Sequence, residues 1–430
     1  MKEYNVRKSP KSKKEYSVVD TEKSRSSPSS HPSDDDRAAA YDVRARREEG
    51  NLFGLPFIPR PVYAVLLILV LCFVSVLVFM NAQGMSPDNF FEWAGGKLLG
   101  IRPGDGFPVT VDGSDHGLGN FQLMDGDPVF LSDTSLSMFS RTGGLISNRQ
   151  HGYARPALKT NGSRALLYDI GGTGFRVESR AALDQENNTA GPIFTGALAA
   201  NGVYAIATGG EGFASVVSVY NRGHEILYTR SVQDYYITGM DLRADGALLA
   251  AGGIWSDEGA LGSTLLLLGF SDQVPVAKFD FPGTMILSIS FLDRGEVVVV
   301  GDRAAYVIGR DYKAFSTYDY KGHALQGYSV NRATGLSLAI ASTDGKNCTL
   351  ASLDNEGKTV AEKDTGTMCT ALYATGDSLF LLSEDILLRY DKKLDKLNEY
   401  PCPAASGGVL VHNNSAYLLG TSQLFKITTE

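Results

Sequence analysis

Cysteine is scarce in this chain of 430 residues, and the positions of its four cysteines exclude a fold held together by disulfide bonds. Cys72 lies inside an apolar run, where a thiol behaves as a small hydrophobic group. Cys348, Cys369 and Cys402 allow at most one internal disulfide, with one thiol left over. We therefore expect the fold to be stabilised by its hydrophobic core, which a chain of this length is large enough to build.

Catalytic signatures are also missing from the sequence. It contains no Gly-x-Ser-x-Gly elbow, no His-Glu-x-x-His or Cys-x-x-Cys motif, no complete EF-hand loop and no glycine-rich phosphate loop. The glycine-rich runs Gly171–Gly174 and Gly209–Gly212 fall between short apolar segments, so we interpret them as turns. The sequence therefore predicts no catalytic residue, no cofactor and no metal site.

Basic residues are in the minority, and the imbalance is uneven along the chain. The whole chain carries a net charge of -8, and residues 1–61 carry +3, which leaves -11 for the remainder. An acidic surface repels the phosphate backbone of nucleic acids. The larger part of the chain is therefore not expected to bind nucleic acid.

One long apolar run is present, the nineteen uncharged residues Val62–Met80. As a helix the run would reach about 28 Å, close to the ~30 Å thickness of the hydrocarbon layer of a bilayer. The alternatives are a buried core helix and a cleaved signal peptide. Core helices rarely run this long without polar residues, and no small-x-small cleavage site follows the run. We expect an uncleaved, single-pass transmembrane helix over residues 62–81.

The charges that flank this run predict its orientation, because Lys and Arg next to a span stay preferentially on the cytoplasmic side. The twenty residues after the run contain one basic residue, Lys97. We therefore expect the N-terminus to be cytoplasmic and the C-terminal domain to be extracytoplasmic. The basic residues before the run are Arg44, Arg46, Arg47 and Arg60.

The segments on either side of the run are polar or rich in glycine. Residues 1–61 contain Ser and Pro clusters and too few apolar residues to form a core, which predicts a disordered cytoplasmic tail. Ser9 and Ser27 precede prolines and are candidate phosphorylation sites, although we favour a tail that only sets topology and solubility. Residues 82–106 are interpreted as a juxtamembrane linker with a short helix at Ser86–Trp93.

The rest of the chain repeats one pattern, a short strand, a tight polar turn and a second apolar strand. Asn-Gly and Asp-Gly are the strongest signals for two-residue hairpins, and successive turns lie ~36 to 50 residues apart, which is the blade period of a β-propeller. Each hairpin is followed by a second strand pair, which gives four strands per repeat. The eight turns are Asp125-Gly126, Asn161-Gly162, Asn201-Gly202, Asp245-Gly246, Arg294-Gly295, Thr334-Gly335, Gly376-Asp377 and Asn413-Asn414.

This repetition predicts an all-β fold, a β-propeller of about eight four-stranded blades over residues 107–430. The number becomes seven if the weaker repeat at Ala157–Pro192 is irregular. The last repeat contains three strands only, while the strand Phe107–Val111 stands alone before the first hairpin. We expect this strand to complete the last blade, because closure removes open sheet edges.

Named propeller families leave fingerprints that are absent here. Gly223-His224 and Gly322-His323 are similar to the Gly-His of WD repeats, but no Trp-Asp follows them. We therefore interpret both histidines as turn residues. Kelch repeats, quinone docking and sialidase boxes need recurrent Trp, whereas the propeller region contains only Trp255.

A family resemblance rests on three runs, FPVTVDGS, LSDTSLSMFS and SNRQHGYARPALKTNGSRALLYDIGGTGFRVESR, which begin at Phe107, Leu131 and Ser147. They resemble an uncharacterised bacterial family of single-pass, membrane-anchored β-propeller proteins with a domain of unknown function. The resemblance covers the apolar run and essentially the whole outer domain. It implies the same architecture and a bacterial cell membrane, and it carries over no catalytic residue.

Propellers usually bind ligands on the face formed by the links between second and third strands and by the links between blades. The longest insertion, Gly252–Ser263, is expected to be a loop there, because long loops on rigid scaffolds often carry function. Other acidic link residues are Asp133, Glu211, Asp344, Glu384 and Asp385. The candidate ligand-binding residues are Trp255, Asp257, Glu258, Tyr235, Tyr236, Tyr153 and Asp302.

Two functions from different classes fit these observations. The first is a non-catalytic binding, scaffold or sensor module that holds a protein, a peptide or a cell-wall polymer outside the membrane. The alternative is an extracytoplasmic propeller enzyme that acts on glycans or peptides. We favour the binding module, because an active site should leave a cluster of His, acid or nucleophile in the loops.

Overall fold

The computed structural model describes residues 65–75, 106–113, 119–343 and 345–429, and the chain divides into two units, Met1–Ala82 and Gln83–Glu430. In the first unit, residues 65–75 form an α-helix whose side chains are exposed. Among the described residues, no helix is both long enough and apolar enough to cross a bilayer. The predicted tail, the predicted linker helix and both ends of the predicted span lie outside the described residues.

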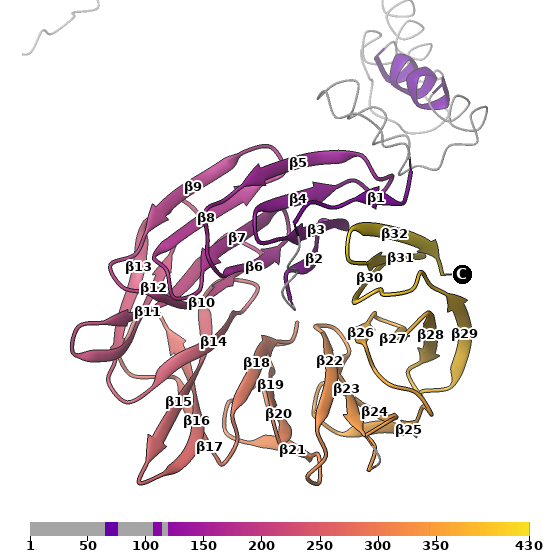
Figure 1. The fold of residues 1–430 in the computed structure, drawn as a ribbon. Helices are drawn as coiled ribbons and strands as arrows, with labels where there is room; N and C mark the ends of the chain where they lie inside the picture. Colours follow the sequence, from indigo (N-terminus) through magenta and orange to yellow (C-terminus); the bar gives the residue numbers. More distant parts are fainter. Residues whose placement is uncertain (1–64, 76–105, 114–118, 344, 430) are drawn as a thin grey trace, which may run out of the picture. The chain divides into compact units, whose positions relative to one another are not determined.

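The second unit is a β-propeller of eight four-stranded antiparallel sheets, as predicted (Figure 1). We number the blades from the first complete sheet in the sequence. Blades one to four consist of β2 (Phe121–Met124), β3 (Asp127–Leu131), β4 (Ser135–Phe139), β5 (Leu145–Gln150); β6 (Pro156–Asn161), β7 (Arg164–Asp169), β8 (Gly174–Ser179), β9 (Leu183–Asn188); β10 (Ile193–Leu198), β11 (Tyr204–Gly210), β12 (Phe213–Tyr220), β13 (Ile226–Val232); and β14 (Tyr236–Leu242), β15 (Leu248–Asp257), β16 (Ala260–Gly269), β17 (Ala277–Pro282).

The remaining four blades follow in chain order. In blades one to seven the first strand in the sequence is the innermost, whereas in the eighth blade the innermost strand is β30 and β1 lies at the outer edge (Figure 1). Blades five to eight consist of β18 (Ile286–Phe291), β19 (Val297–Gly301), β20 (Ala304–Ile308), β21 (Phe315–Asp319); β22 (Leu325–Asn331), β23 (Gly335–Ala341), β24 (Cys348–Leu353), β25 (Thr359–Asp364); β26 (Ala371–Ala374), β27 (Ser378–Ser383), β28 (Ile386–Asp391), β29 (Lys396–Pro401); and β30 (Gly408–His412), β31 (Ser415–Leu419), β32 (Gln423–Thr428), β1 (Val109–Thr110).

The eight predicted turns all connect the first and second strands of a blade. At the first of them Asp125 and Gly126 have φ angles of 53° and 82°, the left-handed pair that a tight hairpin requires. The repeat over Ala157–Pro192 forms a regular blade, β6–β9. The alternative of seven blades is therefore wrong.

Closure of the ring joins the two ends of the propeller, as the strand count predicted. β1 pairs with β32 in antiparallel register, with Val109 opposite Leu424. The Val111 N–H extends the pairing by donating to the Ser422 carbonyl at 3.0 Å. The lone strand thus supplies the fourth strand of the eighth blade, and the sheet edge of β32 is covered.

The hydrophobic core lies between the blades rather than in one central cluster. Each blade is covered by neighbours on both faces, so its second strand is a continuous apolar run instead of an alternating one. In β19, the sequence VVVVG is buried at every position. One cluster joins the sixth and seventh blades and contains Cys348 and Cys369, which are free thiols like the other two cysteines. Burial raises the pKa of Cys369 to about 12.

Neighbouring inner strands are held together by side chains, because their backbones are not paired. Asn120 accepts a hydrogen bond from Leu158 N–H at 3.0 Å and donates to the Pro156 carbonyl at 2.9 Å. Gln122 donates to the Leu158 carbonyl and accepts from both N–H and hydroxyl of Thr160, each at 2.8 Å. These amides connect the first blade to the second.

Candidate functional site

The propeller has two ends, which are formed by different connections. The link face carries the connections between second and third strands and those between blades, and the turn face carries the two hairpin turns of each blade. The sequence places all seven candidate residues on or near the link face. Asp344, an acidic link residue of the sequence analysis, lies outside the described residues.

The inner strands of four successive blades share one irregularity near the link face. β10, β14, β18 and β22 each contain a register shift against the second strand, after Ile193, Ile237, Ile286 and Leu325. Such a β-bulge inserts one residue and redirects its side chain. The inserted residues are Phe194, Thr238, Leu287 and Gln326.

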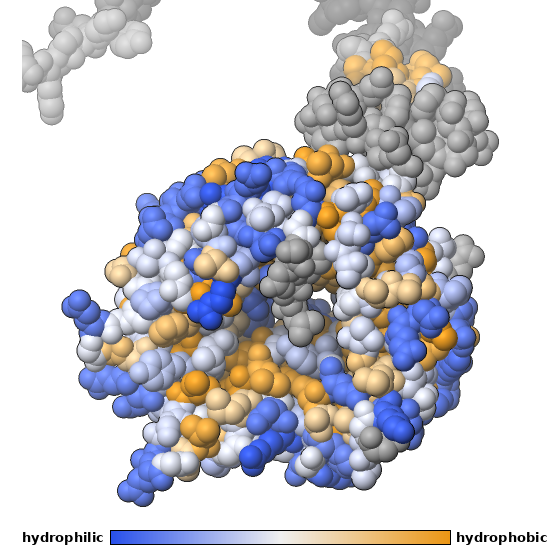
Figure 2. Space-filling model, in the orientation of Figure 1, coloured by the Kyte–Doolittle hydropathy of each residue, from blue (hydrophilic) through white to orange (hydrophobic). Residues whose placement is uncertain are grey.

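Two of these bulges place apolar side chains at the surface of the central hollow. Leu287 is 53% exposed, although Ile286 beside it is 6% exposed. Phe194 is half-buried and contacts Tyr236 edge-on, with 6.2 Å between ring centroids, and Tyr236 is 57% exposed. We call Phe194, Tyr236 and Leu287 the apolar arc. Figure 2 shows hydrophobic surface in the central hollow over the inner strands β14 and β18.

The insertion at Gly252–Ser263 is not a loop, which corrects the sequence-based prediction. β15 and β16 continue through it as ten-residue strands, with a two-residue turn at Glu258 and Gly259. The Trp255 ring covers its cross-strand partner Gly262, where an added Cβ would lie 2.4 Å from the indole. Glycine at this position makes room for the indole, so a regular hairpin forms where the length of the insertion predicted a loop.

This hairpin presents the acidic candidates at its tip. Asp257 and Glu258 are exposed, and Trp255 is half-buried against the hairpin. Glu258 has a φ of 47°, a left-handed turn conformation. Trp255 therefore supports the hairpin with one ring face, and the two carboxylates are free to meet a ligand.

Tyr235 lies at the start of the same blade, and both its ring and its carbonyl group contact other residues of the protein. The Lys278 ammonium lies 5.3 Å from the centre of its ring, and hydrogen bonding to Tyr235 raises the pKa of Lys278. The Tyr235 carbonyl accepts a hydrogen bond from Ser215 at 3.1 Å. Tyr236, the next residue, belongs to the apolar arc. Tyr235, Tyr236, Trp255, Asp257 and Glu258 are thus brought together on the fourth blade.

Tyr153 lies apart from this group, in the link between the first and second blades. Its ring stacks on His151 at 5.3 Å, and the Arg176 guanidinium lies 5.7 Å from its centre. Burial raises the pKa of Tyr153 to about 12, and its hydroxyl has no hydrogen-bond partner in the described structure. Burial also lowers the pKa of His151. Tyr153 therefore packs within its link and contributes little open surface.

Asp302 is used by the backbone of the fifth blade. Its carboxylate accepts a hydrogen bond from Met285 N–H at 2.8 Å, and its own N–H donates to the Met285 carbonyl at 3.0 Å. The pair joins the second strand of the blade to the link that enters it. Among the described residues, no three His, Cys, Asp or Glu side chains gather as a metal site would require.

Sequence reasoning missed two kinds of feature. Phe194 and Leu287 read as ordinary strand residues, although an Ile, one residue and then Thr or Ser recurs at both bulges. It also missed inter-blade clefts on the turn face. One lies between the sixth and seventh blades, with a volume of about 560 Å³, and another between the seventh and eighth, with about 390 Å³.

Comparison with known proteins gives a family and a fold. A family model described as "Family of unknown function (DUF5711)" matches residues 109–400. No curated protein matches the chain in sequence.

Solved structures share the architecture at low sequence identity. Sqt1 from Saccharomyces cerevisiae is 11% identical with a TM-score of 0.51, and the match covers 74% of this chain and 98% of Sqt1. The C-terminal WD40 domain of Sif2 is 12% identical with a TM-score of 0.51, covering 76% and 99%. A quinohemoprotein alcohol dehydrogenase from Pseudomonas putida HK5 is 11% identical with a TM-score of 0.50, covering 75% of each chain. At this identity the likeness concerns the fold alone.

Proposed function

The chain belongs to the DUF5711 family of unknown function, and we propose that it is a non-catalytic binding module whose apolar arc captures a protein or peptide. The observation that carries this proposal is the exposure of Tyr236 and Leu287 on inner strands whose neighbouring isoleucines are buried. Apolar side chains that gather at the surface of a rigid scaffold mark interaction sites. Large apolar anchors of this kind supply most of the affinity of an interface.

The charges around the arc favour a partner with basic side chains. Asp257 and Glu258 stand exposed at the tip of the hairpin on the same blade as Tyr236. Opposite charge across an interface speeds association and selects partners, while apolar contact supplies the affinity. A peptide or protein segment with apolar and basic residues fits both features better than an uncharged cell-wall polymer does.

The fold supports binding without requiring catalysis. A WD40 domain and an alcohol dehydrogenase share this architecture, so the blades alone decide nothing about chemistry. In the link face, Asp302 bonds to backbone and the Tyr153 ring packs on His151 and Arg176. Groups engaged in this way are poor candidates for acid or base catalysis.

We further propose that the binding module is anchored in a bacterial cell membrane, with a cytoplasmic N-terminus and an extracytoplasmic propeller. Residues 65–75 support an anchor, because they form a helix that is apolar on all sides with its side chains exposed. The uncharged run Val62–Met80 and the arginines before it support the same placement. Membrane-impermeant labelling of a cysteine introduced at Gly259, but not of one at Ser29, tests this placement. Labelling of Ser29 in intact cells would contradict it.

Photo-crosslinking tests the binding proposal directly. A photoreactive amino acid in place of Thr238, the exposed bulge residue beside the arc, should capture the partner in intact membranes. Replacing Tyr236 by Ala together with Leu287 by Ser should abolish this capture, because losing interface anchors costs about 2 kcal/mol or more of binding. Leu145→Ser is the matched control, because Leu145 is also 53% exposed but lies on the outer strand β5. Capture that survives the double substitution would exclude the arc.

A further inference from the structure

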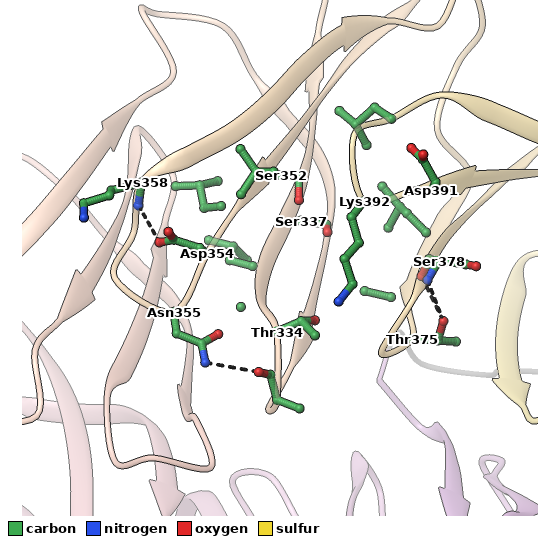
Figure 3. Close-up of a pocket in the computed structure, with 18 of the residues that line it drawn as sticks. Thr334, Ser337, Ser352, Asp354, Asn355, Lys358, Thr375, Ser378, Asp391 and Lys392 are labelled. Atoms are coloured by element: carbon green, nitrogen blue, oxygen red, sulfur yellow. Dashed lines mark hydrogen bonds between the residues drawn. The ribbon is translucent and has the colours of Figure 1, made fainter.

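The cleft between the sixth and seventh blades lies on the turn face, away from the apolar arc. Turns of three blades surround it, and its volume of about 560 Å³ is that of a small-molecule site (Figure 3). The walls come from β23 and β24 on one side and from β27 on the other. Its lining is more polar than apolar in character, with hydroxyl groups on both walls. The hydroxyl-bearing residues are Thr334, Ser337, Ser352, Thr375 and Ser378.

Two of these hydroxyls have no use within the protein. Ser337 and Ser352 are directly opposite each other on β23 and β24, so their side chains share one face of the sixth blade. Neither hydroxyl makes a hydrogen bond within the described structure, although Ser337 is only 8% exposed. By contrast, Thr375 donates to Asp377, and Ser378 accepts from Arg389. The paired serines thus offer unused donors and acceptors to whatever enters the cleft.

The carboxylates that line the cleft are occupied by its turns. Asp354 accepts hydrogen bonds from the N–H groups of Glu356 and Lys358, both at 2.9 Å. Asp391 likewise accepts from two turn N–H groups at 2.8 Å. Glu356 is neutralised by the Lys358 ammonium at 2.6 Å. These acids therefore stabilise the turns, and within the described residues Glu356 is the one among them that is paired with a cation.

Two cations at the cleft have no carboxylate partner in the described structure. Lys392 and Arg294 both line it, and neither makes a side-chain hydrogen bond or ion pair within the described residues. In Figure 3 the Lys392 side chain extends from its turn into the cleft, toward Thr334. Residues 62–430, which carry a net charge of -11, thus present two cations and two hydroxyls without partners among the described residues at one cleft.

We propose that this cleft is a binding site for a small hydroxylated anion, that is, a sugar or polyol that carries a phosphate or carboxylate group. Lys392 and Arg294 would pair with the anionic group, and Ser337 and Ser352 would exchange hydrogen bonds with hydroxyls of the ligand. This site is separate from the apolar arc, because it lies on the opposite face and shares only the fifth blade with it, through Arg294.

Titration calorimetry on the full-length protein tests the proposal with four probes, glucose 6-phosphate, glucuronate, inorganic phosphate and glucose. The phosphorylated sugar or the uronate should bind, and glucose should bind at least tenfold more weakly. Binding should also weaken as salt concentration rises, because the pairing charges lie at a solvent-open cleft. The relative affinities of glucose 6-phosphate and glucuronate identify the anionic group, and binding of inorganic phosphate alone as tightly as glucose 6-phosphate would contradict the role of the serines.

Three variants locate the binding. Lys392→Gln should weaken binding of the anionic sugar about tenfold, since it removes a charge-assisted hydrogen bond. Ser337→Ala with Ser352→Ala should weaken it several-fold while leaving inorganic phosphate unaffected. Lys393→Gln is the matched control, because it removes the same charge from the next residue, which is exposed and does not line the cleft. Equal affinities of the Lys392→Gln and Lys393→Gln proteins, or no binding of any probe, would overturn the proposal.

Discussion

The inner strands of the two halves of the propeller differ in how they pair with the second strands. In the third to sixth blades, which we call the bulged half, every inner strand contains a bulge near the link face. In the regular half, the seventh, eighth, first and second blades, the inner strands pair without a shift. Large exposed apolar side chains occur on the inner strands of the bulged half, Tyr236, Leu287 and Tyr328, and on none of the described inner strands of the regular half.

This difference suggests that the regular half closes the ring and that the bulged half binds the ligand. The regular half contains the joint that closes the ring, where β1 pairs with β32, and amide side chains join its inner strands β2 and β6. The bulged half is continuous in sequence. Each of its inner strands contains one extra residue, which the bulge inserts. A bulge costs ladder hydrogen bonds, so its repetition in four adjacent blades points to a use.

Removing β1, the strand that closes the ring, should have the largest effect on stability and solubility. The effect concerns the regular half, because β1 belongs to the eighth blade. A chain that begins at Asp115 lacks β1 and Val111, which pack with Phe130, Tyr417 and Leu424 in the layer between the eighth and first blades. The exposed edge of β32 should make this protein aggregate and lose cooperative unfolding. A chain that begins at Gly104 is the control and should unfold cooperatively. Equal melting temperatures and solubility for the two proteins would show that closure does not depend on β1.

Neighbouring residues at one bulge should differ strongly in their effect on stability. Ile286→Ala should lower the free energy of unfolding by about 3 kcal/mol, because Ile286 belongs to the core between the fourth and fifth blades. Leu287→Ala should change it by less than ~0.5 kcal/mol, since the side chain is mostly exposed. Urea denaturation measures both. Similar losses for the two variants would mean that the Leu287 side chain packs in the protein and that the bulge does not direct it outward.

How far the sequence predicts this molecule depends on whether the signal is local. Turn pairs such as Asp125-Gly126 determine backbone conformation within four residues, so all eight hairpins could be found. Closure of the ring could be predicted from the strand count, because the last repeat contained only three strands and the strand Phe107–Val111 belonged to no other blade. The bulge at Phe194 and the pairing of Trp255 with Gly262 depend on cross-strand contacts, which no local pattern specifies. The cleft beside Ser337 depends on turns of three blades and could not be predicted from the sequence either.

The inner strands β2 and β6 of the regular half and β14 and β18 of the bulged half are joined by different chemistry, and two substitutions compare these joints. In the regular half, Gln122→Leu should cost about 2 kcal/mol of stability, because Thr160 N–H and the Leu158 carbonyl lose their partner. In the bulged half, Asp241 accepts from Phe291 N–H at 2.7 Å and from Arg332 at 3.1 Å. Burial raises the pKa of Asp241 despite Arg332, so the ion pair contributes little and Asp241→Asn should cost about 1 kcal/mol.

Chemical denaturation at neutral pH distinguishes these two outcomes. Gln150→Leu serves as the control for the amide, because Gln150 is exposed on the outer strand β5 and should tolerate the change. If Asp241→Asn proves more costly than Gln122→Leu, the charged joint is the stronger one, and the expectation that the ion pair contributes little is wrong.

The smallest expected effect is a pH dependence that belongs to the regular half. His151 Nε2 donates to the Ser132 carbonyl at 3.1 Å, and its Nδ1 accepts from Tyr153 N–H at 3.3 Å, so the fold holds the neutral ring. Burial lowers the pKa of His151 below its ordinary value of 6.5, which means that the unfolded chain takes up the proton first as the pH falls. The contribution of His151 is therefore complete above about pH 6.5 and is lost as the pH falls through the lower folded-state pKa.

A histidine in each half allows this last effect to be assigned. The His151→Asn protein should show a flatter dependence of unfolding free energy on pH between 7 and 5 than the unsubstituted protein, measured by urea denaturation at several pH values. His323→Asn, in the link between the fifth and sixth blades, is the matched control, because that imidazole makes no hydrogen bond within the described structure. The slope should persist in the control. If His323→Asn flattens the dependence of unfolding free energy on pH and His151→Asn does not, the acid-sensitive link lies in the bulged half. The assignment of this pH dependence to the regular half would then be wrong.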